Sequence, residues 1–362
     1  MKEKKNGLSP DLIIHPGETL IELLENRNMK QKELAFRTGF SEKHISEIIN
    51  GKATITSKLA ASLENVFDIS ALFWLNLQAN YDIELINYNK MNTVTNAEIS
   101  ILTDLKDILN YLKNTGLLAK TQSKEDDVLN LRKFLAVSSL AVIPSLQFNA
   151  VFRTSTSTHI NLYVLFAWIR LCEVETNNIE MMNILDIEKL RNNIPRVKNV
   201  MNSVSSDIVV ELRSIFSECG IIFHIVKHFK GAPVQGFIEK ATSEQLMLCM
   251  TIRQAWADIF WFTLFHEIGH IVNGDIKKRL VDYVFTETEE EILADQFAQD
   301  ILINPIAYSK FISSGDFSLD AIRQLAKREN IKPYIIIGRL QKEKYLPYQA
   351  LSQEKERYKW AE

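Results

Sequence analysis

The stretch FTLFHEIGH, residues 262–270, places two histidines and a glutamate at the end of an apolar run. Four residues of an α-helix advance about 400°, so His266 and His270 share one face and lie about 6 Å apart along the axis. Both rings can then hold one ion, and a catalytic zinc site uses three protein ligands and a water. Glu267 can take a proton from that water and pass it to a leaving amine. The stretch therefore predicts a catalytic zinc site of the HExxH type, with Glu267 as general base.

The third metal ligand is expected from the next predicted helix. An acidic run opens that helix: Glu287, Glu289, Glu290 and Glu291. Such a run is usually a solvated helix start, but Glu291 begins the sequence EILADQFA, in which Ala294 is small enough for close packing on the histidine helix. Asp295 shares the face of Glu291 and can accept the spare N–H of a ligating histidine. We expect Glu291 to be the third ligand, with Glu290 as the alternative, and Asp295 to support a histidine.

The opposing interpretation is a helix with two chance histidines that are satisfied within the core. The apolar residues before His266 and the small Gly269 beside His270 favour the metal site, because a helix under an active site is buried and closely packed. We expect one Zn²⁺ per chain, and the sequence does not distinguish Zn²⁺ from Mn²⁺.

FWFTLFHEIGHIVNG followed by EEEILADQFAQDILINP resembles the ImmA/IrrE family of metallopeptidases. The family pattern is HExxH with a downstream E-x-x-A-[ND]-x-F-A and a proline, and this chain has NP where the family often has MP. The resemblance covers roughly residues 181–345. It implies a thermolysin-like (gluzincin) fold in which His266, His270 and Glu291 hold zinc and Glu267 is the base. It does not name the substrate, and some members of the family bind partners with little turnover.

A second motif, QKELAFRTGFSEKHISEIINGK at residues 31–52, has the layout of a helix-turn-helix. A glycine turn at Gly39 separates two short helices, and the second would enter the DNA major groove by its N-terminal residues. Residues 27–58 carry seven lysines and arginines against three glutamates, a local net charge of +4. That is a small positive patch for binding DNA phosphates. The candidate DNA contacts are Gln31, Ser41, Lys43, His44, Ser46, Asn50 and Lys52. The alternative is a helical protein-interaction module, which the glutamates on the second helix favour.

Residues 15–82, from HPGETL to LQANYD, resemble the HigA-type antitoxins of the Xre/Cro group. Lys30 departs from that pattern, which usually has a small hydroxyl residue there. The resemblance implies a homodimer that binds a double-stranded DNA operator. It also implies membership of a toxin–antitoxin or stress-response operon with a cognate toxin.

Composition narrows the function classes. The 362 residues carry a formal net charge of −3, so any DNA binding must come from a local patch rather than from overall attraction. The scattered Cys172, Cys219 and Cys249 argue against a disulfide framework or a cysteine zinc site and for a reducing compartment. No apolar segment of signal-peptide length follows the basic N-terminus. We expect a cytoplasmic protein without membrane contact.

The expected fold is multidomain. Residues 1–89 predict an all-α helix-turn-helix domain, residues 90–180 a helical connecting region, and residues 181–362 an α+β peptidase domain. In the last part, IIFHIV, KHFKGAPVQGFIEK and LMLCMTI predict three short strands. The uncharged run from Phe134 to Phe152 contains a proline and polar residues, so we interpret it as buried or connecting chain rather than a membrane span.

The leading hypothesis is an antitoxin-type DNA-binding transcriptional regulator that carries a zinc-dependent metallo-endopeptidase domain. That domain would cleave a regulator, a toxin or the chain itself. The alternative is a non-catalytic repressor or antitoxin whose C-terminal domain binds a toxin or senses a ligand or metal. The glutamate in HExxH favours turnover, because a purely structural zinc site needs no general base.

Overall fold

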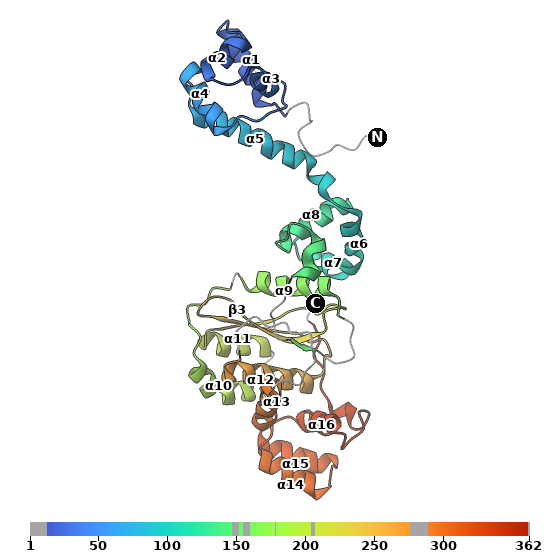
Figure 1. The fold of residues 1–362 in the computed structure, drawn as a ribbon. Coiled ribbons are helices and arrows are strands. Elements are labelled where there is room, and N and C mark those ends of the chain that lie inside the picture. The colour runs from blue at the N-terminus through green and yellow to red at the C-terminus, as the bar shows by residue number, and fades with distance from the viewer. Residues whose placement is uncertain are drawn as a thin grey trace. The chain divides into compact units, whose positions relative to one another are not determined.

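The computed structural model describes residues 13–146, 152–154, 160–177, 179–203, 207–275 and 289–360. The chain folds into two compact units, Met1–Asn96 and Ala97–Glu362. Helices dominate both, and the second unit also contains a small sheet (Figure 1). Within the described ranges, none of the helices combines the length and the apolar character that a membrane span requires.

The first unit is all α-helical, as expected. Its helices are α1 (Pro16–Asn26), α2 (Gln31–Thr38), α3 (Glu42–Ile49), α4 (Ser57–Phe67) and α5 (Ala71–Asn89), followed by the 3-10 turn η2 (Lys90–Thr93). Gly39 ends α2 with a left-handed backbone (φ 75°), which glycine adopts without strain. The Ser41 side chain then caps α3 by accepting a hydrogen bond from the His44 N–H. The helices close on a core that includes Leu34, Ile45 and Trp74, all fully buried.

The second unit begins with helices that the sequence places in the connecting region. They are α6 (Asn96–Asp104), α7 (Lys106–Asn114), α8 (Lys124–Phe134), the 3-10 helix η3 (Leu140–Ser145) and α9 (Leu162–Thr176). Glu98 of α6 is fully buried and is held by Arg132 of α8 at 2.6 Å, by the Ser139 hydroxyl and by the Leu140 N–H. A buried carboxylate with this many donors fixes the helices to one another.

A four-stranded sheet in the order β1-β3-β4-β2 forms the centre of the second unit. The strands are β1 (Phe152–Thr154), β2 (Ile221–Ile225), β3 (Val234–Lys240) and β4 (Leu246–Met250). The strand predictions are confirmed for β2, β3 and β4, whereas β1 lies at the end of the run interpreted as buried or connecting chain. Strand β3 is antiparallel to β4, and β2 is parallel to β4.

Helices cover both faces of this sheet. Helix α9 lies on one face, where the Trp168 and Phe237 rings are 5.8 Å apart. The other face carries α10 (Ile187–Val200), α11 (Ile208–Glu218) and α12 (Ala257–Asn273), and the Phe216 and Phe223 rings stack there at 5.1 Å (Figure 1). Because side chains alternate along a strand, neighbouring residues of β3 contact helices on opposite faces of the sheet. Phe237 faces α9, and Gly236 faces α12.

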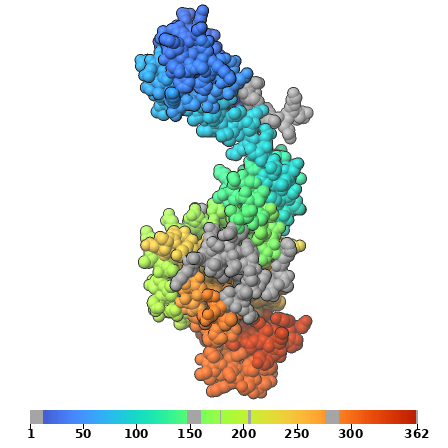
Figure 2. Space-filling model, viewed as in Figure 1, coloured from blue at the N-terminus to red at the C-terminus, as the bar shows by residue number. Residues whose placement is uncertain are grey.

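The C-terminal helices complete the core around α12. They are α13 (Glu289–Leu302), α14 (Pro305–Ser314), α15 (Leu319–Glu329) and α16 (Pro333–Lys342), followed by the 3-10 turn η4 (Ser352–Glu354). Figure 2 shows α14–α16 as one continuous orange-to-red surface. Asn304 caps α14 and Pro305 starts it, so the chain turns at the Asn-Pro pair between α13 and α14.

A short C-terminal segment, residues 355–358, fixes the start of α12. The Ala257 N–H donates to the Glu356 carbonyl at 3.0 Å, and the Tyr358 N–H donates to the Ala255 carbonyl at 2.7 Å. Lys355 forms a buried ion pair with Asp258 at 2.6 Å. The first turn of a helix has unpaired N–H groups, so these contacts from a distant part of the chain anchor the helix that carries HExxH.

Candidate metal centre and nucleic-acid interface

Helix α12 is apolar on nearly all sides, which is the pattern of a helix inside a core. It ends at Gly274, whose backbone is left-handed (φ 81°), a conformation that glycine adopts without strain. His266, Glu267 and His270 are 1%, 3% and 5% exposed. Polar groups this deeply buried need partners, so these side chains are part of an internal site rather than a solvated surface.

Three side chains from two helices converge at this site. His266 Nε2 and His270 Nε2 lie 3.0 Å apart, and the Glu291 carboxylate oxygens lie 3.2 Å from the first and 3.4 Å from the second. Ligands bound at 2.0–2.1 Å in tetrahedral geometry lie about 3.3 Å from one another. The two histidine nitrogens and the Glu291 carboxylate therefore have the spacing of three ligands on one face of a zinc tetrahedron. Among the described residues, Glu291 joins this cluster, and its neighbour Glu290 does not.

Each histidine is oriented by an aspartate on its other ring nitrogen. His266 Nδ1 lies 2.7 Å from Asp295 Oδ1, and His270 Nδ1 lies 3.3 Å from Asp275 Oδ2. A proton on Nδ1 that is donated to a carboxylate leaves the Nε2 lone pair directed at the cluster, as a metal ligand requires. Asp295 was expected in this role, and Asp275 was not. Asp275 directly follows the glycine that ends α12, and that position was the signal available in the sequence.

Close packing brings α13 within reach of α12. A Cβ added at Gly269 would lie 3.1 Å from the Ala294 Cα and 3.2 Å from the Phe297 ring. A larger residue at position 269 would push the helices apart and move Glu291 away from the histidines. The small residues at positions 269 and 294 are therefore required by the geometry of the site. Glu287, the first residue of the acidic run, lies outside the described residues.

Glu267 lies between α12 and strand β3. A Cβ added at Gly236 would collide with the Glu267 carboxylate, so the strand runs directly against this side chain. The absence of a side chain at position 236 leaves the carboxylate its place beside the strand. Gly236 is a site residue that reasoning from the sequence missed, because one glycine within a strand has several structural explanations.

The charges in the site favour a cation. Burial lowers the pKa of His270, but the Glu291 hydrogen bond and the charges of Glu267 and Glu291 outweigh it and raise that pKa to about 9. Burial raises the pKa of Glu291, but its hydrogen bonds to His266 and His270 outweigh that effect and hold it well below its usual range. Without a metal, the site holds protons between the carboxylates and imidazoles. A divalent ion would replace them, because bound histidines must be neutral at the coordinating nitrogen.

We expect Asp295→Ala to weaken zinc binding about 10- to 100-fold, because His266 loses the acceptor that fixes its ring and raises its basicity. Competition with a fluorescent zinc chelator measures the change. Asp300→Ala, on the same helix and hydrogen-bonded to Gln296 rather than to a histidine, is the matched control. Equal affinities for the two variants would contradict a supporting role for Asp295.

Helix α3 presents a polar, exposed face at its start. The Lys43 side chain is 84% exposed and lies 3.7 Å from Glu47. His44 stacks on Phe40, with ring centroids 5.3 Å apart, and Ile45 is fully buried. The buried isoleucine fixes the rotation of the helix, so Lys43 projects outward at the end expected to enter a groove.

The other candidate DNA contacts divide into two groups. Gln31, at the start of α2, and Lys52, just after α3, are exposed. Ser41 is the helix cap, and the Asn50 side chain donates to the Ser46 carbonyl at 2.7 Å and lies 3.2 Å from its hydroxyl. Ser41, Ser46 and Asn50 therefore also take part in capping contacts of α3.

Comparison with known proteins identifies the family of the first unit. A helix-turn-helix (HTH_3) family model matches residues 20–74. An uncharacterized HTH-type transcriptional regulator of Haemophilus influenzae is 37% identical over 75 residues, which are 20% of this chain and 70% of that protein. The chain belongs to the helix-turn-helix family. The membership rests on its N-terminal domain, which is a helix-turn-helix domain of the transcription-regulator type.

Other known proteins are similar to a part of this chain of about the same length. The uncharacterized HTH-type regulator YbaQ of Escherichia coli is 37% identical over 75 residues, and the chain spans 66% of its length. Among solved structures, an addiction module antidote protein of the HigA family from Coxiella burnetii is 34% identical, covers 23% of this chain and 95% of its own, and has a TM-score of 0.21. The Pseudomonas aeruginosa antitoxin HigA, solved with the higBA promoter, is 30% identical, covers 23% and 96%, and also has a TM-score of 0.21.

Proposed function

We propose that this protein is an antitoxin-type transcriptional regulator that binds operator DNA through α3 and carries a zinc-dependent peptidase domain. The observation that carries the peptidase half is the triangle of His266, His270 and Glu291, with Glu267 on the same helix. Zn²⁺ supplies a Lewis acid and an activated water when bound. The chain supplies three ligands, two supporting aspartates and a carboxylate that can accept a proton.

The resemblance to the ImmA/IrrE metallopeptidases supports this assignment, because the residues that match that family's motif are the ones that converge. Glu267 is buried, and its charge acts on His270. A carboxylate next to a metal ligand can hold the proton of an attacking water and return it to the leaving amine. The proposed substrate is a peptide bond in a regulator, in a toxin or in the chain itself, and Mn²⁺ could stand in for Zn²⁺.

For the DNA-binding half, the support is the helix-turn-helix family match together with the exposed start of α3. The proposed partner is double-stranded operator DNA, read by Lys43 and the polar side chains around it. A toxin partner is part of the proposal, because the HigA proteins named above are an antidote and an antitoxin.

A homodimer is also part of the proposal. Helix α5 exposes large apolar side chains, among them Leu72 at 64%, Ile83 at 56% and Ile86 at 65%. An apolar helix surface of this kind is costly in water, and a second copy of the helix could cover it. Two helix-turn-helix domains would then read half-sites about one turn of DNA apart.

The alternative function is a repressor whose C-terminal domain binds a ligand or partner without cleaving it. The same metal cluster would serve as a sensor, in which zinc occupancy itself is the signal. The Glu267 variant described in the Discussion separates the two, because a sensor needs the ligands and not the base.

We expect Lys43→Ala to weaken binding to upstream DNA by about 1–3 kcal/mol, because a side chain at the start of the recognition helix reads base edges. Lys52→Ala should weaken binding to all sequences alike and reduce the slope against log salt by about one, as the loss of one phosphate contact does. Fluorescence anisotropy at several salt concentrations measures both changes.

Lys90→Ala, in the turn after α5, is the matched control for these lysine variants. A zinc chelator should leave DNA affinity unchanged, because the metal cluster and α3 lie in different compact units. If no upstream fragment binds better than random DNA, the first unit is a protein-interaction module. If the chelator abolishes binding, metal acts as the switch.

A further inference from the structure

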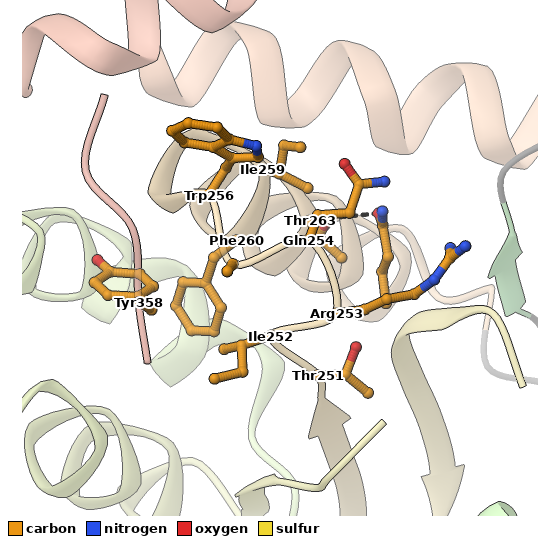
Figure 3. Close-up of a pocket in the computed structure, with 11 residues that line it drawn as sticks. Thr251, Ile252, Arg253, Gln254, Trp256, Ile259, Phe260, Thr263 and Tyr358 are labelled. Carbon is orange, nitrogen blue, oxygen red and sulfur yellow. Dashed lines mark hydrogen bonds between the residues drawn. The ribbon is translucent and has the colours of Figure 1, made fainter. Parts of the chain in front are cut away.

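Side chains around the N-terminal end of α12 enclose a small pocket, which Trp256, Phe260 and Tyr358 help to line (Figure 3). The pocket has room for about one water molecule. Two of its lining residues are joined directly, because the Thr263 hydroxyl donates to the Gln235 side chain at 3.2 Å. The pocket is therefore too small for a ligand, and the contacts across it hold α12 against the sheet.

The helix-turn-helix, in contrast, carries positive charge that its own acids do not neutralise. Each of the three glutamates in residues 27–58 lies beside a basic side chain: Glu42 and Lys32 at 3.8 Å, Glu33 and Arg37 at 2.6 Å, and Glu47 and Lys43 at 3.7 Å. Arg27 donates to the Phe67 carbonyl. Lys30, Lys52 and Lys58 pair with no carboxylate among the described residues. The net charge of +4 in this stretch therefore belongs to Arg27 and these three lysines.

Lys58, near the start of α4, differs from the other three because it lies on an aromatic ring. Its Nζ is 5.7 Å from the centre of the Phe40 ring, close enough for an ammonium to be attracted to the ring face. Unlike a carboxylate, a ring carries no charge, so the ammonium can still bind a phosphate. The Phe40 ring also stacks on His44, with centroids 5.3 Å apart and planes inclined by 21°. Phe40 thus joins Lys58 to the first turn of α3.

The local sequence fixes Phe40 in this position. Gly39 turns the chain with its left-handed backbone, and Ser41 caps α3, so Phe40 is the residue just before the cap. An apolar residue there commonly packs on the first turns of the helix and sets the angle at which the chain enters it. Phe40 also packs in part against the core of the first unit. The core therefore holds the ring on which His44 and Lys58 lie.

We propose that Phe40 is a positioning residue for DNA reading, which holds His44 toward base edges and Lys58 toward a phosphate of the same site. The proposal rests on the proposed operator binding through α3, and it adds Lys58 to the DNA contacts. A flexible lysine loses freedom when it binds, so a ring that already holds it lowers the entropic cost of the contact. An imidazole can donate or accept a hydrogen bond at a base edge in the major groove.

The test measures fluorescence anisotropy of the full-length chain with the DNA upstream of its gene and with random DNA of the same length, at several salt concentrations. We expect His44→Ala to lower the preference for the upstream DNA about 5- to 100-fold, as the loss of a base contact does. Lys58→Ala should weaken binding to both DNAs alike and reduce the slope against log salt by about one.

Phe40→Leu keeps an apolar side chain and removes the ring. It should lower the preference for the upstream DNA about 2- to 10-fold, because it frees His44 without deleting it. In a chain that already carries His44→Ala, Phe40→Leu should not change the preference further, since the two side chains act together. Phe40→Tyr retains the ring and should bind as the wild type does. Phe36→Leu is the matched control, because Phe36 lies on α2 and is 88% exposed.

The outcomes separate this proposal from operator binding itself. A preference that survives Phe40→Leu, or that falls equally in Phe36→Leu, overturns the positioning role and leaves DNA binding standing. An equal effect of Phe40→Leu with and without His44 also overturns it, as a general loss of fold would give. Lys58→Ala alters only an exposed side chain, and a wild-type salt slope in that variant overturns the phosphate contact. If the wild-type chain does not prefer upstream DNA, the proposed operator binding and this proposal both fail.

Discussion

Glu267→Gln is expected to retain zinc and lose peptide cleavage by a factor of about 10² or more, because the amide keeps the size of the side chain and cannot accept the proton. The wild-type and variant chains are loaded with zinc and incubated with a peptide mixture. Mass spectrometry then follows new peptide ends over time, including any that arise from the chain itself. The buried setting of Glu267 against Gly236 favours this variant, since it adds no volume to a tight contact.

The control for this variant is Glu290→Gln, the same substitution on α13 next to a proposed ligand. It should cleave at the wild-type rate. Zinc content is measured for both variants, so a loss of cleavage can be assigned to proton transfer rather than to loss of metal. A Glu267→Gln chain that cleaves as fast as wild type would remove Glu267 as the base. A wild-type chain that binds zinc and yields no new peptide ends would favour the sensor function.

His270→Ala is expected to abolish stoichiometric zinc binding, because the remaining His266 and Glu291 offer only two ligands where a catalytic site uses three. The wild-type chain should hold about one zinc per molecule by elemental analysis. At free zinc about a hundred times the dissociation constant, binding should stabilise the wild-type fold by about 2.7 kcal/mol. The variant should show no such stabilisation in thermal unfolding.

His44→Ala is the control for the loss of one imidazole, since His44 lies on α3 in the other unit. It should keep both the zinc and the zinc-dependent stabilisation. Glu291→Ala should weaken zinc binding strongly, because it removes the carboxylate ligand from the set formed with His266 and His270. Full zinc content in His270→Ala would rule out the proposed ligand set. Full content in Glu291→Ala would assign the third position to another acid.

The helix-turn-helix shows how far local sequence can determine structure. The Gly39 turn, the Ser41 cap and the buried Ile45 all lie within a few residues of one another, and each acts on its own neighbours. Capping and the 3.6-residue period are short-range effects, so the sequence was sufficient to place α2 and α3. The same reasoning placed β2, β3 and β4. It did not find β1, because three residues are too few for a period of two to be recognised.

Part of the metal site follows from the sequence alone, and part of it depends on the tertiary structure. The sequence by itself determined that His266 and His270 share a face, because their spacing is one helical turn, and it singled out Glu291 among four acids by the small residue that follows. Only the tertiary structure decided that Glu291 comes within 3.2 Å of His266. That approach depends on two helices meeting at Gly269, and no short-range pattern sets the distance between them.

Other parts of the site lie beyond what one sequence could determine. Asp275 supports His270 after the chain has turned at Gly274, Gly236 leaves space for Glu267 from a separate strand, and Tyr358, late in the chain, accepts a hydrogen bond from Trp261 of the helix that carries the histidines. Each of these contacts joins segments whose proximity is set by packing of the sheet and helices around one core. Spacing along the chain determines which side chains can act together on a single helix. The tertiary fold alone decides which strand, loop and C-terminal segment surround them, because those neighbours are selected by close packing and not by sequence distance.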